Sequence, residues 1–168
     1  MWNDTDTPIA YLITFRTYGT WLHGDERGSV DRHNNVYGTP RIRRNDTWQR
    51  IETRSLIREP VLLDARRRGA VENAIRDTCK KRGWNLIAIN VRTNHIHALV
   101  GASKQPDQIL TAFKANATRQ MRDAGCWDSE LSPWAEKGSK RHLWNEKSVG
   151  LAADYVINGQ GDDLPTFE

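Results

Sequence analysis

The sequence predicts an α+β fold in which an antiparallel sheet carries amphipathic helices on one face. Two observations lead to this prediction. Short runs rich in β-branched and aromatic residues alternate with longer segments in which apolar residues recur at helical spacing. The length of 168 residues fits one domain, because a chain of this size buries roughly 70% of its unfolded surface. We therefore expect a single domain over residues 1–168.

The N-terminal half is expected to contain a strand, a long loop and a helix. Residues 9–17 are rich in β-branched and aromatic residues, with Tyr11, Ile13 and Phe15 on one side, and predict the strand. Residues 18–58 contain glycines, a proline and many charges, with no sustained period of 2 or 3.6, which predicts a long loop. Residues 63–82 place apolar side chains at helical spacing, and Gly83 predicts the end of that helix.

The C-terminal half is expected to complete the sheet. Its predicted elements are a strand at 84–91, a connection at 92–94, a strand at 95–101, a helix from 106 to about 125, a short strand at 141–144 and a helix at 148–158. Ser148 is expected to cap the last helix, and Gly159 to end it. Strand, helix, strand, strand, helix, strand is the order of the ferredoxin-like split β-α-β arrangement, to which the last helix is an addition.

The composition favours a nucleic-acid partner and a reducing compartment. The chain has 25 Lys and Arg against 21 Asp and Glu, a net charge of +4 and a pI near 9.3. Basic residues cluster at 41–44, 66–68, 80–82 and 137–141, where they could neutralise phosphates, although a solvated face explains any one cluster equally well. Two cysteines cannot build a disulfide framework, and no apolar run reaches the ~18 residues of a membrane span. We expect a soluble cytoplasmic protein with no membrane partner.

A pair of histidines marks the predicted strand at 95–101. Because successive side chains alternate faces, His95 and His97 project from one face of the strand, and Ile96 and Ala98 from the other. Residues two apart on a strand have Cα atoms ~6.6 Å apart, so both imidazoles can approach one metal ion if a third ligand arrives from elsewhere. Two ordinary half-buried or surface histidines are the competing interpretation.

The last predicted helix carries a second candidate. Tyr155 is followed by Asn158 one turn later and by Gln160 just past Gly159. A phenol, with a pKa of about 10, needs a cation or a base nearby to act as a nucleophile. Amide oxygens are acceptable ligands for hard metal ions. A tyrosine in a helix is otherwise usually a core residue.

Four segments together resemble the HUH family of single-strand DNA transposases with one catalytic tyrosine, and within it the transposases associated with repetitive extragenic palindromes. Asn94–Val100 resembles the histidine, bulky apolar, histidine signature, and Ala153–Gln160 resembles the tyrosine helix, in the family's order. Tyr11–Gly24 resembles the first strand and loop of one branch of the group, and Phe113–Arg119 resembles part of the second helix. The resemblance covers about residues 8–160.

The resemblance implies a metal-dependent transposase that nicks and joins single-stranded DNA, near hairpin-forming repeats. Tyr155 would attack the phosphorus, which gives a 5′-phosphotyrosine link and a 3′-hydroxyl. His95 and His97 would hold Mg²⁺ or Mn²⁺, which polarises the scissile phosphate. The enzyme would act as a monomer or as a homodimer.

One position departs from the family. Relatives often supply a third metal ligand four positions after the tyrosine, where this chain has Gly159, which lacks a side chain. Asn158 stays on roughly the same helix face as Tyr155, whereas Gln160 reaches the metal only if the helix ends or unwinds at Gly159. Both are candidate ligands, and Gln160 is slightly favoured because a glycine invites such an ending.

Candidate DNA contacts are basic and aromatic side chains outside these motifs. Basic side chains can neutralise phosphates, and Trp21 or Trp144 could stack on an unpaired base, although tryptophan is more often a core residue. The chosen candidates are Arg16, Lys114, Arg119, Lys140, Arg141 and Trp21.

The competing function is that of a catalytically inactive ferredoxin-like protein that binds single-stranded nucleic acid. Such domains place aromatic residues on their central strands, whereas here that strand offers His95 and His97, which favours metal chemistry. A replication-initiating or conjugative HUH nuclease shares the metal pair, but usually carries further domains.

Overall fold

A four-stranded antiparallel sheet forms the centre of the computed structural model, which describes residues 7–20 and 58–159. The sheet order is β2-β3-β1-β4. The strands are β1 (Ala10–Thr17), β2 (Asn85–Val91), β3 (His95–Gly101) and β4 (Trp134–Leu143). Most of the loop predicted at 18–58, with Trp21, lies outside the described residues, and so does Gln160.

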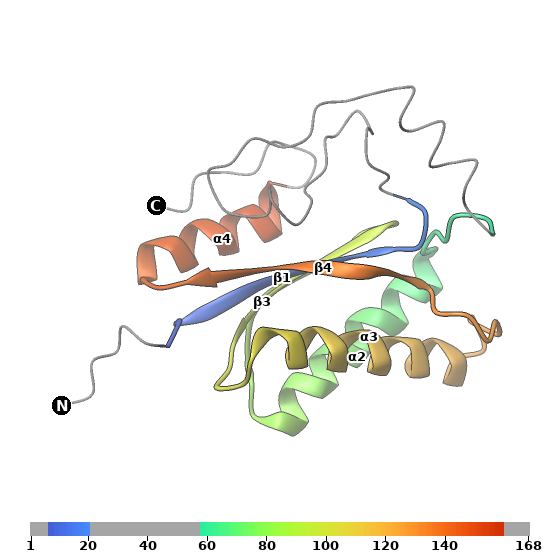
Figure 1. The fold of residues 1–168 in the computed structure, drawn as a ribbon, viewed down its shortest axis with the longest axis horizontal. Coiled ribbons are helices and arrows are strands. Elements are labelled where there is room, and N and C mark those ends of the chain that lie inside the picture. Colours follow the sequence, from blue (N-terminus) through green and yellow to red (C-terminus); the bar gives the residue numbers. More distant parts are fainter. Residues whose placement is uncertain (1–6, 21–57, 160–168) are drawn as a thin grey trace.

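Helices cover both faces of the sheet (Figure 1). α2 (Ala65–Arg82) and α3 (Pro106–Asp123) lie together on one face, and α4 (Glu146–Asn158) lies on the other. The antiparallel sheet and the element order confirm the predicted α+β fold, with α4 as the addition to the split β-α-β core. Within the described part of the chain, no helix has the length and apolar character needed to cross a membrane.

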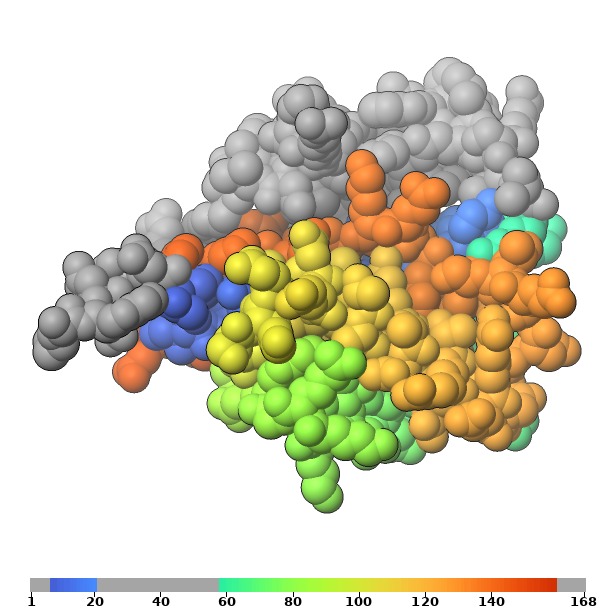
Figure 2. Space-filling view, turned by 60° about the horizontal axis from the view of Figure 1, so that its bottom comes forward, coloured from blue at the N-terminus to red at the C-terminus, as the bar shows by residue number. Residues whose placement is uncertain are grey.

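The face under α2 and α3 carries the larger hydrophobic core. Alternation along the strands turns Phe15 of β1 and Ile96 and Val100 of β3 to this face, where all three are fully buried. Phe113 of α3 belongs to the same cluster and is also fully buried. Each such side chain contributes roughly 1.5–3 kcal/mol on burial. Figure 2 shows the outer surface of this layer, formed largely by atoms of α2 and α3.

Two residues define the ends of α2. The side chain of Asp64 accepts a hydrogen bond of 2.9 Å from the backbone N–H of Arg67, which satisfies one donor of the first turn. Gly83 has a φ of 70°, a left-handed conformation that glycine adopts without steric cost. The predicted end of the helix is confirmed, and its start lies at Ala65.

β4 is longer than the sequence predicts. It covers ten residues, Trp134–Leu143, whereas a short strand at 141–144 was expected. That expectation was wrong because residues 136–139 have charged, glycine and serine side chains with little strand propensity, and only pairing with β1 reveals the strand. At Gly138 a Cβ would come within 2.7 Å of the backbone oxygen of Thr14, so this close pairing requires glycine.

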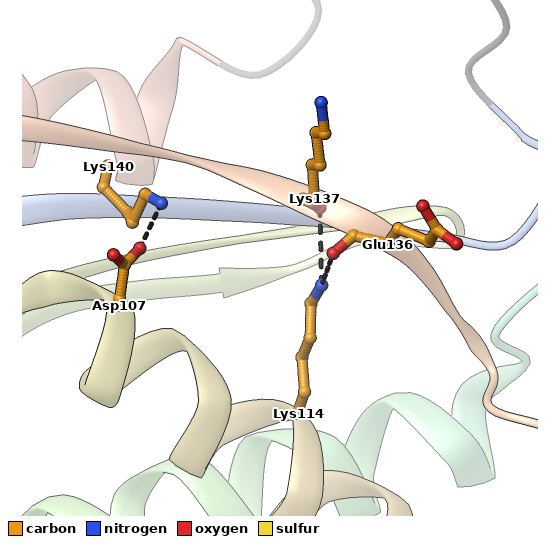
Figure 3. A network of polar contacts seen from close by, with 5 residues as sticks. All are labelled: Asp107, Lys114, Glu136, Lys137 and Lys140. Carbon is orange, nitrogen blue, oxygen red and sulfur yellow. Dashed lines mark hydrogen bonds and ion pairs between the residues drawn. The ribbon is translucent and has the colours of Figure 1, made fainter. Parts of the chain in front are cut away.

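Side chains of α3 and β4 fasten the two elements together (Figure 3). The amino group of Lys114 donates to the backbone oxygens of residues 135–137, at 2.8 to 3.4 Å. Lys140 forms an ion pair with Asp107 at the start of α3. Burial, together with the neighbouring cations Arg16 and Lys140, lowers the pKa of Lys114.

α4 packs on the sheet through a narrow stripe of small and apolar residues. Ala152 and Val156 are fully buried in a second cluster with Leu12 of β1 and Leu99 of β3. The side-chain amide of Asn90 in β2 donates to the backbone oxygen of Val156 at 2.9 Å. The helix is therefore held on β2, β3 and β1 by packing and by a hydrogen bond.

The cap of α4 differs from the expected one. The side chain of Asn145 accepts a hydrogen bond of 2.8 Å from the backbone N–H of Ser148, so Asn145 is the N-cap and the helix starts at Glu146. The predicted cap at Ser148 was wrong because the asparagine three residues earlier takes this role. Gly159 follows the last helical residue, as predicted.

Candidate functional site

His95 and His97 lie on the face of the sheet that α4 covers. The register of β1 and β3 places Arg16 opposite His95 and Thr14 opposite His97. The centroids of the two imidazole rings are 5.0 Å apart, with an interplanar angle of 75°. His97 is buried, with 4% of its surface exposed, and His95 is partly buried. The two rings thus stand side by side on one face, as the alternation along the strand predicted.

Tyr155 reaches the same place from α4. Its ring centroid lies 5.3 Å from that of His97, at an interplanar angle of 70°, and the residue is 9% exposed. Ala152 and Val156 pack inward on either side of it along the helix, which fixes the rotation of α4 and turns Tyr155 toward the sheet. The structure therefore brings together the three side chains for which a catalytic role was predicted.

A neighbouring side chain contacts the Nδ1 atom of each imidazole. The Nδ1 atom of His97 lies 2.7 Å from the hydroxyl oxygen of Thr14, and the contact is buried. The Nδ1 atom of His95 lies 2.7 Å from Oδ1 of Asn94. Histidines that bind metal through one ring nitrogen usually have such a partner at the other. This donor set is compatible with metal binding through both Nε2 atoms.

The described residues do not complete a metal site on their own. Among residues 7–20 and 58–159, no group of three His, Cys, Asp or Glu side chains could hold a metal ion. Asn158 is exposed, and its Nδ2 atom donates to Oδ1 of Asp154 at 2.9 Å. Gln160 lies outside the described residues. Two imidazoles fit a divalent ion if oxygen ligands come from a further residue, water or a phosphate.

Two of the predicted DNA contacts belong to the histidine face of the sheet. Arg16 lies opposite His95 in the register of β1 and β3. Arg141 of β4 lies opposite Leu12, whose side chain packs in the cluster under α4. Because directly paired residues share a face, Arg141 projects on the side of α4. Cationic side chains on this face are suitably charged for a phosphate backbone.

Three other predicted DNA contacts lie with α3, on the opposite face. The amino group of Lys114 is engaged by the carbonyl oxygens of residues 135–137, and Lys140 is paired with a carboxylate of α3 (Figure 3). Arg119 is exposed on α3 and donates to Oδ1 of Asn116 at 2.7 Å. The structure does not bring these three side chains to the histidine pair.

Sequence reasoning missed Thr14 and Asn94. Asn94 could have been found from its position directly before His95, because a short amide side chain can reach the adjacent ring. Thr14 has no such signal, because its place opposite His97 depends on the register between β1 and β3, and this register cannot be deduced from the sequence. Trp144, weighed as a stacking residue, is 51% exposed and stacks on His142 with ring centroids 6.0 Å apart.

Comparison with known proteins identifies the family of this chain. A family model described as "Transposase IS200 like" matches residues 51–149, more than half of the chain, including both histidines. Tyr155 lies beyond the end of the matched span. A crystal structure from Deinococcus radiodurans R1, provisionally described as a transposase, matches at 16% identity over 93% of each chain, with a TM-score of 0.45. A search of curated proteins finds no match.

Proposed function

The chain belongs to the family of IS200-like transposases, and from this premise we propose that it nicks and joins single-stranded DNA through a covalent link to Tyr155. One observation carries the proposal: the ring of Tyr155 lies 5.3 Å from that of His97, although the two residues come from separate elements of the fold. Three chemically suitable side chains meet on one face of the sheet.

In the proposed reaction, the phenol oxygen of Tyr155 attacks the phosphorus of a DNA phosphodiester. The bond between phosphorus and the 3′ oxygen breaks, and that oxygen leaves as a 3′-hydroxyl with the net transfer of the phenol proton. The product is a 5′-phosphotyrosine, whose bond energy allows rejoining by attack of a 3′-hydroxyl. No external nucleotide is needed for either direction.

His95 and His97 are the proposed ligands of a divalent ion, Mg²⁺ or Mn²⁺. Their Nδ1 atoms already contact Asn94 and Thr14, so we assign the Nε2 atoms to the ion. When bound, such an ion neutralises charge on the scissile phosphate and polarises it. Gln160 is the proposed third ligand, with Asn158 as the alternative.

The proposed DNA-binding surface is the α4 side of the sheet. Arg16 and Arg141 are the proposed phosphate contacts there, because their strand positions put them on or beside the histidine face. Arg119, Lys114 and Lys140 lie with α3, and the last two already have partners that hold β4 in place. DNA contacts from these three residues and from Trp21 remain predictions. Hairpin-forming repeats as the substrate, and a monomeric or homodimeric state, are also predictions.

The competing function is binding of single-stranded nucleic acid without catalysis. Proteins of that kind read bases with aromatic residues on the central strands. Here the α4 side of β3 carries His95, His97 and Leu99 instead, and the tyrosine comes from a helix.

A single-domain organisation over residues 1–168 and a cytoplasmic location also remain predictions.

The test is a search for the covalent adduct. The full chain is incubated with single-stranded hairpin DNA from the flanks of its own gene, with and without Mn²⁺, and separated under denaturing conditions. Tyr155→Phe is expected to bind the hairpin but to form no adduct. Tyr11→Phe, which changes a buried tyrosine on the other face, is the matched control and is expected to keep the adduct. An adduct that persists in Tyr155→Phe overturns the proposal.

A further inference from the structure

We propose that Asn94 and Thr14 are positioning residues, which hold the two imidazoles in the tautomer and orientation that a metal ion requires. The inference rests on the proposed function, since it concerns the same histidine pair. It assigns a role to two side chains that lie within family-like segments but have no role in the predicted chemistry.

The contact of Asn94 determines which nitrogen of His95 carries the proton. The Oδ1 atom of Asn94 lies 2.7 Å from the Nδ1 atom of His95. A side-chain carbonyl oxygen only accepts hydrogen bonds, so the ring must donate from Nδ1. A neutral imidazole protonated at Nδ1 has its lone pair at Nε2, and this is the form in which it can bind a metal through Nε2.

Asn94 is itself held in place by the end of β1. Its backbone oxygen accepts a hydrogen bond from the backbone N–H of Thr17 at 3.0 Å. The hydroxyl group of Thr17 also lies 3.3 Å from this oxygen, and the hydroxyl of Thr20 donates to the backbone oxygen of Thr17 at 2.9 Å. These bonds tie the turn between β2 and β3 to the neighbouring strand, so the amide of Asn94 is presented to His95 from a fixed backbone.

Thr14 acts on His97 from the centre of the sheet. The two residues are directly paired in the register of β1 and β3, and both are buried. The hydroxyl oxygen of Thr14 lies 2.7 Å from Nδ1 of His97. A hydroxyl can accept the Nδ1 proton, and the restricted χ1 of a β-branched residue keeps the oxygen in place. Burial strengthens the contact because the surrounding dielectric is low.

The experiment measures metal affinity rather than DNA cleavage. The dissociation constant for Mn²⁺ is determined with the full chain, without DNA, by electron paramagnetic resonance of the unbound ion. Loss of a partner behind a metal-binding histidine typically weakens metal affinity by roughly 10–100-fold, and this is expected for Asn94→Leu and for Thr14→Val. Asn94→Asp and Thr14→Ser keep an acceptor oxygen and are expected to stay near the wild-type value.

A matched pair of control variants lies on the opposite face. The amide of Asn116 donates to the hydroxyl of Thr78 at 2.9 Å, a polar contact between α3 and α2. Asn116→Leu and Thr78→Val remove groups of the same kind, and are expected to leave Mn²⁺ affinity unchanged. If these controls weaken binding as much as Asn94→Leu and Thr14→Val do, the role is general structural support and the proposal is overturned.

A second readout does not depend on any variant. Nitrogen-15 chemical shifts of the wild-type histidines, measured where the rings are neutral, are expected to show the Nδ1–H tautomer at His95. Protonation at Nε2 overturns the assignment. If the folded wild type binds no Mn²⁺ either alone or with single-stranded DNA present, the metal part of the proposed function fails together with this inference. If it binds Mn²⁺ and both Asn94→Leu and Thr14→Val keep the wild-type affinity, only this inference fails.

Discussion

The two faces of the central sheet are built from the same strands but in different ways. On the α2 and α3 side, β1 and β3 present apolar residues such as Phe15 and Ile96, which are fully buried. On the α4 side, the apolar cluster includes Tyr155, and the buried polar residues Thr14 and His97 lie on the same face. Buried polar groups lower stability unless they are paired. The proposed chemistry therefore belongs to the face on which buried polar side chains contact one another.

The largest expected effect is on the apolar face. Phe113→Ala removes a fully buried ring from the core between α3 and the sheet, and is expected to lower the free energy of unfolding by roughly 3–5 kcal/mol. Urea denaturation measures this loss. Ile157→Ala, at an exposed position of α4, is the control and is expected to change stability by less than about 0.5 kcal/mol. Similar losses in both variants would remove the distinction between the faces.

On the histidine face, substitutions are expected to lower activity rather than stability. His95→Ala removes one of the two proposed metal ligands and is expected to slow nicking of single-stranded DNA by about 10²-fold or more. The effect should be at least as large as that of removing a residue that hydrogen-bonds to a metal-binding histidine. Since His95 is only partly buried, the melting temperature should change little. His142→Ala, at an exposed histidine of β4, should keep the wild-type rate. An unchanged rate in His95→Ala would contradict the assignment.

Two glycines sharpen the comparison through effects of opposite sign. Gly138→Ala places a Cβ 2.7 Å from the backbone oxygen of Thr14 and close to Leu110, so β4 must shift, with a loss of roughly 1–3 kcal/mol in stability. Gly150→Ala in α4 meets nothing within 4 Å and should stabilise the helix by roughly 0.5–1 kcal/mol. Thermal unfolding measures both, and a stabilising Gly138→Ala would show that β4 adapts freely.

The smallest expected effect depends on pH. The pKa of Lys114 is lowered from 10.5, chiefly by burial, so the folded state disfavours its charged form. This destabilising contribution is fully present at neutral pH and disappears as the pH rises through the lowered pKa toward 10.5. The free energy of unfolding of the wild type, measured relative to Lys114→Met, should therefore increase over this alkaline range. A difference that stays constant from neutral pH to 10.5 would contradict the direction of the shift.

Much of the fold could be predicted because its elements have local signals. β3 matches its predicted range, and Gly83 ends α2 as expected. β4 was mostly missed, because residues 136–139 form a strand through pairing with β1 rather than through their own propensity. The cap of α4 was misassigned because two capping residues, Asn145 and Ser148, lie three positions apart.

The candidate site was predictable to the extent that it follows from alternation and motif. His95 and His97 share a face because they are two residues apart on a strand, and this holds wherever the strand lies in the sheet. Thr14 joins them only through the register between β1 and β3, which depends on the packing of the whole sheet. Tyr155 could be selected from the sequence, but its contact with His97 depends on how α4 packs.

The short connection before α4 has a mechanical consequence. Only Trp144 and Asn145 separate the end of β4 from the start of the helix, and two extended residues span at most ~7 Å. The first turn of α4 is therefore tethered to the sheet edge, while Tyr155 lies ~13 Å further along the helix axis at a rise of 1.5 Å per residue. On a lever arm of that length, a rotation of α4 by about 20° around this connection would displace the phenol ring by ~5 Å from its present position beside His97. Such a rotation would break the packing of Ala152 and Val156 and the hydrogen bond from Asn90, but would leave the core beneath α2 and α3 intact.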